Sequence, residues 1–534
     1  MSFLEQRETK DNPPTSPTPE TKMETTPSQS RWLWAYGWMP AWLRKMDRGI
    51  LALTIVFVLT LPLFTPRIYA SDEIKYFSYL HSIFFDHDVD FTNEYSYFYN
   101  SDPVKYADFK ASVINKLNEK GLPVNEGPVG SAILWTPFYG IAHVAALAGN
   151  ALGLKSFKPD GFSTPYVWAV TLASLLYGFA GLIFSYLLAR NFMPSFWAAF
   201  GTITVWLASP VIFYMSLTPP MSHANSLFMI SLWLWLWYRT REWRFDKDGK
   251  FTPGVRRGSM WLLLGVLGGL TAMVREQDGT VLIVGAVESL FLYWHFWRNR
   301  PAPASGGKAA LIPPGWLSLF GRNLVFLFGL AFSLVPQFIV YAALNGHPGP
   351  SKTVGDKLQF FSLEVPGRLL GLLGDPDHGL FWWAPVLLPA LVGLVMLVWR
   401  KEFRLVAIVL LFAFFAELYI SASFQTWTMK GSFGPRRLIG ISPAYIVGLG
   451  FLGWWLSQLK TGWKISKRVL VGLATLFIIW NFGVIIQFTT LREGDSRQGL
   501  DPARVVVDQF TKVPGKLIDT AERFLFKRDS FYKK

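Results

Sequence analysis

The residues best suited to chemistry are six carboxylates that lie within 23 positions of one another: Asp72, Glu73, Asp86, Asp88, Asp90 and Glu94. A partly desolvated carboxylate can take a proton from a hydroxyl group, so Asp72, with Glu73 beside it, could serve as a general base. The alternative is structural, because acidic residues favour a helix N-terminus and residues 73–85 have apolar residues at helical spacing. The sequence leaves both interpretations of Asp72 and Glu73 open.

The run Asp86, Asp88 and Asp90, together with Glu94, also offers oxygen ligands for a divalent metal. It lacks the spacing of a calcium-binding hand and its final bidentate glutamate. His223 lies in a Pro-rich segment and could bind a metal or a substrate hydroxyl, although this segment also reads as a turn in which Ser222 caps a helix. The pattern therefore allows a divalent metal, and it establishes no cofactor.

Three arginines could bind an anion, because a guanidinium group matches the geometry of a phosphate. Arg275 lies between two short apolar runs, and Arg436 and Arg437 precede a later one. Each has a structural alternative: Arg275 could pair with Asp278 in a tight turn, and the other two could extend toward the membrane interface. Asp377 and His378 are weaker candidates, in a turn that leads into the next helix.

The elements that must position these residues are apolar helices in a membrane. Of the 534 residues, 51% are hydrophobic and 16% charged, whereas soluble proteins carry about a quarter charged residues. Tryptophan occurs 24 times, and amphipathic aromatic residues favour membrane interfaces. The absence of cysteine excludes disulfides and thiolate metal sites. The net charge of +15 falls mainly in short loops between apolar runs, which indicates membrane topology and no nucleic-acid partner.

Hydropathy gives twelve apolar stretches, which begin near positions 49, 129, 165, 195, 222, 259, 280, 321, 381, 403, 439 and 467. Four later loops are basic: 239–258, 298–322, 400–404 and 458–468. If one early stretch does not cross, all four fall on the cytoplasmic side, as the bias of basic residues requires. The stretch 129–150 is rich in small residues and contains Pro137. We therefore predict an all-α fold of about eleven transmembrane helices, with 129–150 re-entrant or interfacial.

This topology divides the chain into segments. We expect a disordered cytoplasmic tail at 1–30, a cytoplasmic juxtamembrane segment at 31–48 and a transmembrane catalytic module at 49–343, which includes the outer loop 71–164. An outer loop at 344–380 would cover the site, followed by transmembrane helices at 381–487 and a C-terminal tail at 488–534. Most of the polar candidates then face one non-cytoplasmic compartment.

The residues after the first helix resemble those of the C-type glycosyltransferase superfamily. The resemblance rests on Asp72-Glu73-Ile74-Lys75-Tyr76-Phe77-Ser78-Tyr79-Leu80, on Asp86-His87-Asp88-Val89-Asp90-Phe91, and on Ser432-Phe433-Gly434-Pro435-Arg436-Arg437-Leu438. The superfamily includes protein O-mannosyltransferases, the catalytic subunit of oligosaccharyltransferase and the lipid A aminoarabinose transferase. The likeness covers residues 49–300 best, with 421–443. Met429 and Lys430 stand where small residues are commoner.

The resemblance implies a multi-pass protein of the bacterial inner membrane that takes a sugar from a polyprenyl-phosphate carrier and inverts the anomeric centre. The family's catalytic carboxylate maps onto Asp72. The acceptor would be an envelope glycan, lipid or protein, and Arg275, Arg436 or Arg437 would neutralise the departing phosphate. A transporter or flippase of a lipid-linked sugar is the main alternative, and a non-enzymatic assembly protein is another.

Overall fold

The computed structural model describes residues 47–103, 106–300, 314–376, 378–429, 431–460, 465–491 and 500–527. The predicted tail 1–30, most of the segment 31–48, and the candidates Asp377 and Lys430 lie outside this set. The candidate residues all lie within the compact unit Arg48–Lys534. Within the described residues the fold is helical, and two short strands form one antiparallel hairpin, which confirms the predicted all-α class.

The helices follow the apolar stretches of the sequence closely. The first half contains α3 (Arg48–Thr60), η1 (Leu61–Leu63), α4 (Ser71–His81), the π-helix η2 (Ser82–Asp86), α5 (Thr92–Ser101), α6 (Ala107–Phe109), the π-helix η3 (Lys110–Ile114), α7 (Gly130–Ala151), α8 (Thr164–Ala189), α9 (Ser195–Leu207), α10 (Val211–Ser216), α11 (His223–Arg239), β1 (Arg244–Phe245), β2 (Phe251–Thr252) and α12 (Gly258–Val274). The second half contains η4 (Glu276–Leu282), α13 (Ile283–Arg298), α14 (Pro314–Asn345), α15 (Lys352–Gly355), α16 (Val365–Gly374), α17 (Leu380–Trp383), α18 (Leu387–Leu397), α19 (Arg404–Ser423), η5 (Arg436–Leu438), α20 (Ser442–Ser457), α21 (Lys467–Thr490), α22 (Pro502–Thr511) and α23 (Val513–Phe526).

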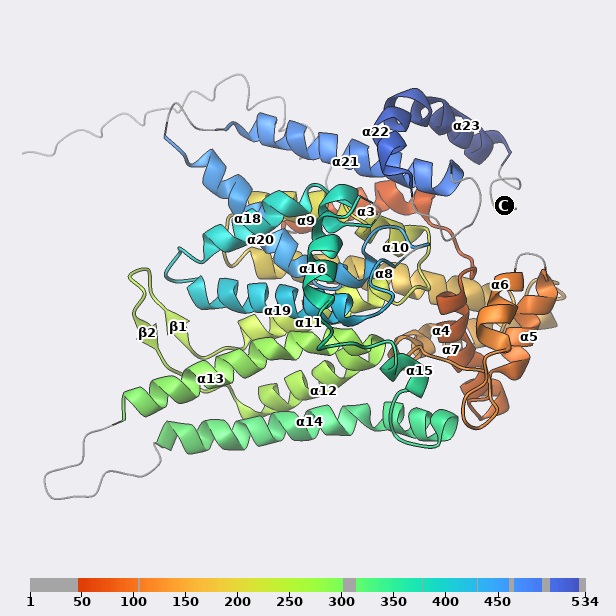
Figure 1. Ribbon diagram of the computed structural model, residues 1–534, viewed down its shortest axis with the longest axis horizontal. Coiled ribbons are helices and arrows are strands. Elements are labelled where there is room, and N and C mark those ends of the chain that lie inside the picture. Colours follow the sequence, from red (N-terminus) through yellow and green to blue (C-terminus); the bar gives the residue numbers. More distant parts are fainter. Residues whose placement is uncertain are drawn as a thin grey trace, which may run out of the picture. The chain divides into compact units, whose positions relative to one another are not determined.

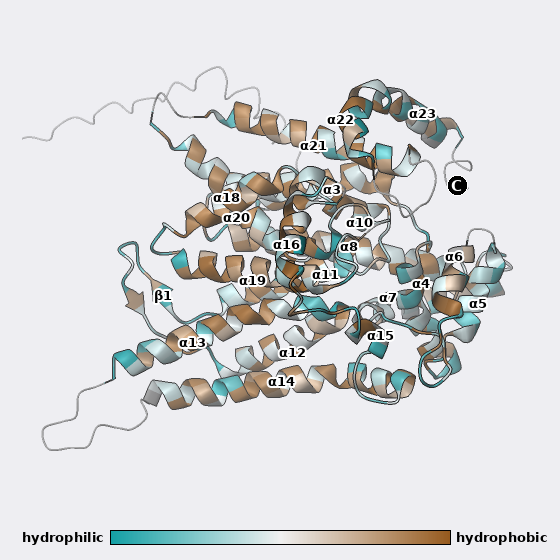
Figure 2. Ribbon diagram, in the orientation of Figure 1, coloured by the Kyte–Doolittle hydropathy of each residue, from teal (hydrophilic) through white to brown (hydrophobic). Residues whose placement is uncertain are grey.

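Many of these helices face an apolar solvent. Six have the length and hydropathy of a membrane span, namely 130–151, 164–189, 276–298, 315–345, 404–423 and 467–490, and shorter apolar helices accompany them. Large side chains on α14 point away from the protein, among them Phe328 and Phe332, each 66% exposed. Figure 2 shows apolar residues along α12, α13, α14 and α19, while polar residues gather around α4 and α5. The chain is therefore a multi-pass membrane protein.

The helix α7 has the length of a span but does not link the two ends of the bundle. Its neighbours α3 and α8 run antiparallel, because Gly49 faces Tyr186 at one end while Phe64 and Trp168 meet at the other. The chain between them, α7 included, thus begins and ends on one side. Tyr177, halfway along α8, donates to a carbonyl near the start of α7, so α7 dips only partway into the bundle. This placement agrees with the predicted non-spanning helix.

The described parts of the predicted basic loops lie at the end of the bundle opposite α4. Figure 1 places the β1–β2 hairpin, the end of α13, the start of α14 and the α18–α19 connection together at that end. A buried ion pair fastens this end: Arg256 lies 3.1 Å from Glu288, which also accepts from the indole nitrogens of Trp237 (2.6 Å) and Trp243 (2.8 Å). The single-sided grouping agrees with the charge argument, since a basic loop favours one face of the membrane.

Candidate active site

Asp72 and Glu73 begin α4 but point in different directions. Glu73 is 1% exposed, and its Oε2 accepts from the backbone nitrogens of Tyr69 (2.6 Å) and Ala70 (3.0 Å). Glu73 thus caps the helix, and burial raises its pKa to about 7 despite these two hydrogen bonds. The Asp72 side chain is 38% exposed and faces a cavity. The structural interpretation therefore holds for Glu73, whereas the Asp72 carboxylate does not cap the helix by these contacts and faces the cavity.

The Asp72 carboxylate meets an arginine that is far away in the sequence. Its Oδ2 lies 3.0 Å from Nη2 of Arg436, whose side chain is 27% exposed. Burial opposes ionisation of Asp72, but the charges of Arg436, Lys75 and Arg275 outweigh it and hold the pKa of Asp72 below its ordinary value. Asp72 is therefore ionised at neutral pH. Its partner Arg436 also lines the cavity, so the same guanidinium is accessible to a ligand there.

That cavity has a volume of about 260 Å³ and lies at the α4 end of the bundle. Its lining comes from five separate parts of the chain: Asp72, Lys75 and Tyr76; Glu126, Gly127 and Pro128; Arg275, Glu276 and Gln277; Val354 and Lys357; Phe424, Thr426, Arg436 and Arg437. Five of these side chains are basic and three are acidic. The cavity thus carries a formal excess of positive charge and suits an anionic ligand.

The third arginine of the site, Arg275, is held between α12 and η4. Its Nη1 donates to Ser222 Oγ (3.1 Å) and its Nη2 to Gln277 Oε1 (3.2 Å), while Asp278 lies 3.9 Å away. The predicted Arg275–Asp278 pair is therefore present, although its distance is long for an ion pair. Arg275 also lines the cavity. Gln277 in turn donates to the backbone oxygen of Arg437 (2.8 Å). This amide joins the turn that carries Arg275 to the turn that carries Arg436 and Arg437.

The segment before η5 is shaped by unusual backbone angles. Met429, Gly431 and Gly434 all have positive φ values (51°, 84° and 61°), which fold the chain into a tight path. Phe433 is wholly buried, stacks on Phe213 at 4.5 Å between ring centroids, and donates its backbone N–H to Tyr214 Oη (2.9 Å). This anchor fixes the arginines that follow. The positive φ of Met429 is one that glycine adopts freely and that residues with a side chain adopt rarely.

Sequence reasoning missed the rim of the cavity. Glu126 lies 2.7 Å from Lys357, 3.6 Å from Lys75 and 3.8 Å from Lys116. Burial opposes ionisation of Glu126, but the three ammonium groups lower its pKa below the usual value. Glu126 lies in a polar segment just before α7. No pattern in the neighbouring sequence indicates that Lys357, more than 200 residues later, would contact it.

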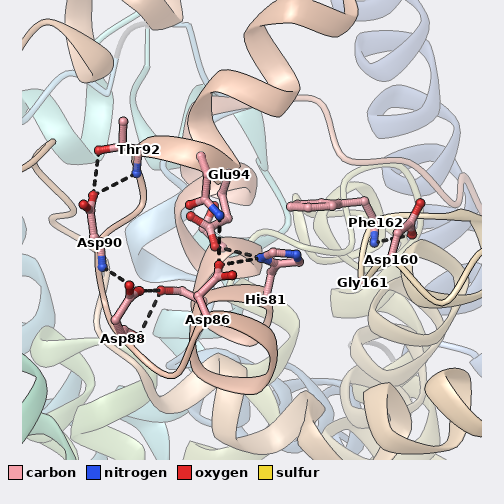
Figure 3. A network of polar contacts seen from close by, with 12 residues as sticks. His81, Asp86, Asp88, Asp90, Thr92, Glu94, Asp160, Gly161 and Phe162 are labelled. Atoms are coloured by element: carbon pink, nitrogen blue, oxygen red, sulfur yellow. Dashed lines mark hydrogen bonds and ion pairs between the residues drawn. The ribbon is translucent and has the colours of Figure 1, made fainter.

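The other predicted residues do not line this cavity. His223 is 1% exposed at the start of α11 and packs edge-on against Tyr214. His378 is buried and stacks on Trp383. Asp88 accepts from Ser82 Oγ (2.8 Å), and Asp90 accepts from the backbone of Thr92 (3.0 Å), so both carboxylates shape the turn between η2 and α5 (Figure 3). Asp86 and Glu94 instead meet His81, which the sequence did not single out.

Comparison with known proteins gives one weak structural likeness. No family model matches the chain, and no curated protein matches it. The solved structure is ArnT from Cupriavidus metallidurans, crystallised bound to undecaprenyl phosphate, which overlays with a TM-score of 0.40 and 14% sequence identity. The overlap covers 90% of this chain and 72% of that one. The chemistry of the present chain is accordingly inferred from its own site.

Proposed function

We propose that this chain is a C-type membrane glycosyltransferase that moves a sugar from a polyprenyl-phosphate carrier to a hydroxyl group of an envelope acceptor on the non-cytoplasmic face. One observation carries the proposal: Asp72, a candidate base, lies 3.0 Å from Arg436 in a cavity that Arg275 and Arg437 also line. A base and several phosphate-binding groups around one space are what transfer from a sugar phosphate requires.

The reaction assigns a separate role to each of these groups. The acceptor hydroxyl gives its proton to the Asp72 carboxylate while its oxygen forms a bond to the anomeric carbon. The bond between that carbon and the phosphate oxygen breaks, and its electron pair stays on the phosphate. Arg436, Arg437 and Arg275 stabilise the negative charge that develops there. Attack from the face opposite the leaving phosphate inverts the anomeric centre.

The Asp72–Arg436 pair gives the donor a second effect. An aspartate whose guanidinium partner holds its pKa low is ionised but weakly basic. A lipid phosphate that binds Arg436 competes with Asp72 for the same guanidinium, because both are anions that accept its N–H groups. Donor binding thereby loosens the pair and makes the carboxylate a stronger base. The base is thus activated only when the sugar donor is present.

A transporter or flippase of a lipid-linked sugar is the second candidate, and two buried acids favour it. Asp278 is 0% exposed, and Glu417 is 1% exposed within the predicted span of α19. Buried acids in membrane helices are frequent in transporters. Here Glu417 accepts from Gln277 (3.0 Å) and Thr280 (2.7 Å), which support the Arg275 turn. This structural role accounts for Glu417 without transport, and the transferase remains the better proposal.

The test is complementation of cells that lack this chain. Asp72→Asn and the matched control Asp102→Asn, an exposed acid of the same outer loop, are expressed at equal levels in the membrane. Cells without the chain, or with Asp72→Asn, should accumulate sugar-loaded polyprenyl phosphate in lipid extracts and lose a sugar from an envelope polymer. Wild type and Asp102→Asn should reverse both effects. Full reversal of both effects by Asp72→Asn would reject the transferase. If Asp72→Asn restores the cells but Asp278→Asn does not, the transporter is favoured.

A further inference from the structure

A second cluster of polar groups lies at the other end of α4, away from the cavity. His81 Nδ1 lies 2.9 Å from Oε1 of Glu94 and 3.1 Å from Oδ2 of Asp86. One ligand atom from each of these three residues falls within 4.8 Å of the other two. Figure 3 shows both carboxylates directed at the same edge of the imidazole ring. The cluster joins three consecutive elements, because His81 ends α4, Asp86 ends η2 and Glu94 lies in α5.

Asp86 and Glu94 both approach the same nitrogen of His81, Nδ1, and this distinguishes the cluster from an ordinary ion pair. A protonated imidazole has two N–H groups that point in different directions, and each can serve one carboxylate. Here two carboxylates crowd the one proton that Nδ1 can carry. A cation placed among the three groups would account for this arrangement. For bonds of about 2.0–2.2 Å, ligand atoms around a tetrahedral ion lie about 3.3–3.6 Å apart, so the two observed distances of 2.9 and 3.1 Å need to lengthen by only a few tenths of an ångström.

Burial of Glu94 is an independent indication. The residue is 0% exposed, and its second oxygen, Oε2, receives no hydrogen bond from a donor among the described residues. A buried carboxylate oxygen without a donor is costly unless a cation compensates it. Asp86 is partly exposed, with 30% of its side chain accessible, so water or a further ligand could complete the coordination from that side.

The surroundings hold the three groups in place, as the outer neighbours of a metal site do. Asn93 Nδ2 donates to Asp86 Oδ2 (2.9 Å), which orients that carboxylate. The His81 ring lies between Phe85 and Phe162, with centroids at 5.0 and 4.0 Å and interplanar angles of 10° and 22°. The aromatic rings thereby fix the imidazole plane.

We propose that His81, Asp86 and Glu94 bind one divalent transition-metal ion, with Zn²⁺ the best match to one nitrogen and two carboxylate ligands. Asp86 and Glu94 are among the possible metal ligands that the sequence offered, whereas His81 is not. Asp72 and His81 are nine residues apart on one helix, or about 14 Å. The ion is therefore structural: it fastens the end of α4, and so the helix that carries Asp72, to α5. The proposal stands independently of the transferase function.

Metal analysis of the full-length protein tests the site. The protein is purified without a histidine tag, its bound metals are counted by mass spectrometry, and it is then stripped with a chelator and titrated with Zn²⁺, Mn²⁺ or Mg²⁺. We expect about one equivalent of transition metal per chain. Zn²⁺ should raise the unfolding temperature of the stripped protein by about 2–5 °C, and Mg²⁺ should not.

Variants assign the effect to these residues. His81→Ala and Glu94→Gln should lose the metal and the shift. His143→Ala, a histidine of the same outer segment, and Asp90→Asn, an acid of the neighbouring turn, should keep both. A wild-type protein that holds no metal and shows no response to Zn²⁺ would overturn the proposal, as would an unchanged response in folded His81→Ala. If the variants do not fold, the wild-type stoichiometry and its preference for Zn²⁺ over Mg²⁺ decide the matter.

Discussion

Replacing Asp72 by Asn should separate donor binding from sugar transfer, and in opposite directions. The neutral amide keeps the shape of the side chain but removes the negative charge beside Arg436. The guanidinium is then free to bind a phosphate, while the acceptor hydroxyl loses its base. We therefore expect Asp72→Asn to bind polyprenyl phosphate more tightly than wild type and to transfer sugar far more slowly.

The expected size of the effect comes from the geometry of the pair. Asp72 and Arg436 are 3.0 Å apart, so a phosphate on the far side of the same guanidinium would lie roughly 6 Å from the carboxylate. At that separation, two like charges repel by about 1.5–3 kcal/mol for an effective dielectric constant of about 20–40. Both side chains are partly exposed, and solvent screening favours the lower value, which corresponds to roughly tenfold tighter binding. Loss of the general base should lower the transfer rate by about 10²–10⁴-fold.

The assay measures binding of undecaprenyl phosphate to the protein in lipid nanodiscs, alongside transfer in the same preparation. Asp102→Asn is the control for removal of one negative charge from the outer loop. Arg436→Gln should weaken binding by about 1.5–3 kcal/mol, because a charged hydrogen-bond donor is lost. Weaker or unchanged binding by Asp72→Asn, or transfer close to that of wild type, would refute the reasoning.

Three further predictions concern charge and burial. Arg275→Lys should weaken lipid-phosphate binding about tenfold in the nanodisc assay, because one ammonium cannot hold Ser222 and still present a planar fork to phosphate; unchanged affinity would contradict this. Because burial raises the pKa of Glu73 from 4.5 to about 7, the folded protein binds this proton more tightly, and stability should fall by up to about 3 kcal/mol as pH rises from 4.5 to 7. Glu73→Gln should flatten this pH profile of the unfolding temperature, and an equally steep profile would exclude Glu73 as its source. Glu288→Ala leaves the Arg256 charge buried and should destabilise the protein by about 3–5 kcal/mol in thermal unfolding, whereas a loss under 1 kcal/mol would show that the pair is dispensable.

The helices were predictable because hydropathy is a local property. The predicted stretches near 165, 195, 222, 259 and 467 begin within one residue of α8, α9, α11, α12 and α21. The basic loops were predictable for a similar reason, since each is a run of residues whose charge favours one side of the membrane. The count of membrane crossings between the basic loops also predicted that residue 72 and residues 436–437 lie at one end of the bundle.

The contacts within the site were not predictable in this way. Asp72 and Glu73 are adjacent and chemically alike, and only the direction of α4 decides that one faces the cavity while the other caps the helix. The partners of Glu126 come from residues 75, 116 and 357, which no local pattern connects. The acids Asp86, Asp88 and Asp90 are neighbours in the sequence, but no local pattern indicates that Asp86, at the end of the π-helix η2, lies 3.1 Å from His81.

Hydropathy and charge along the chain were enough to predict that it crosses a membrane many times, where many of its long apolar helices begin, and that Asp72 and Arg436 lie at one end of the bundle. These properties depend on the apolar runs and on the charge of the loops between them. Each run and each loop can be assessed from its own residues, without knowledge of its contacts. The folded chain was needed to show that Asp72 pairs with Arg436, that Glu73 is a cap and that His81 joins Asp86 and Glu94. Such contacts depend on side-chain directions fixed by helix packing across hundreds of residues, and packing is a property of the whole bundle.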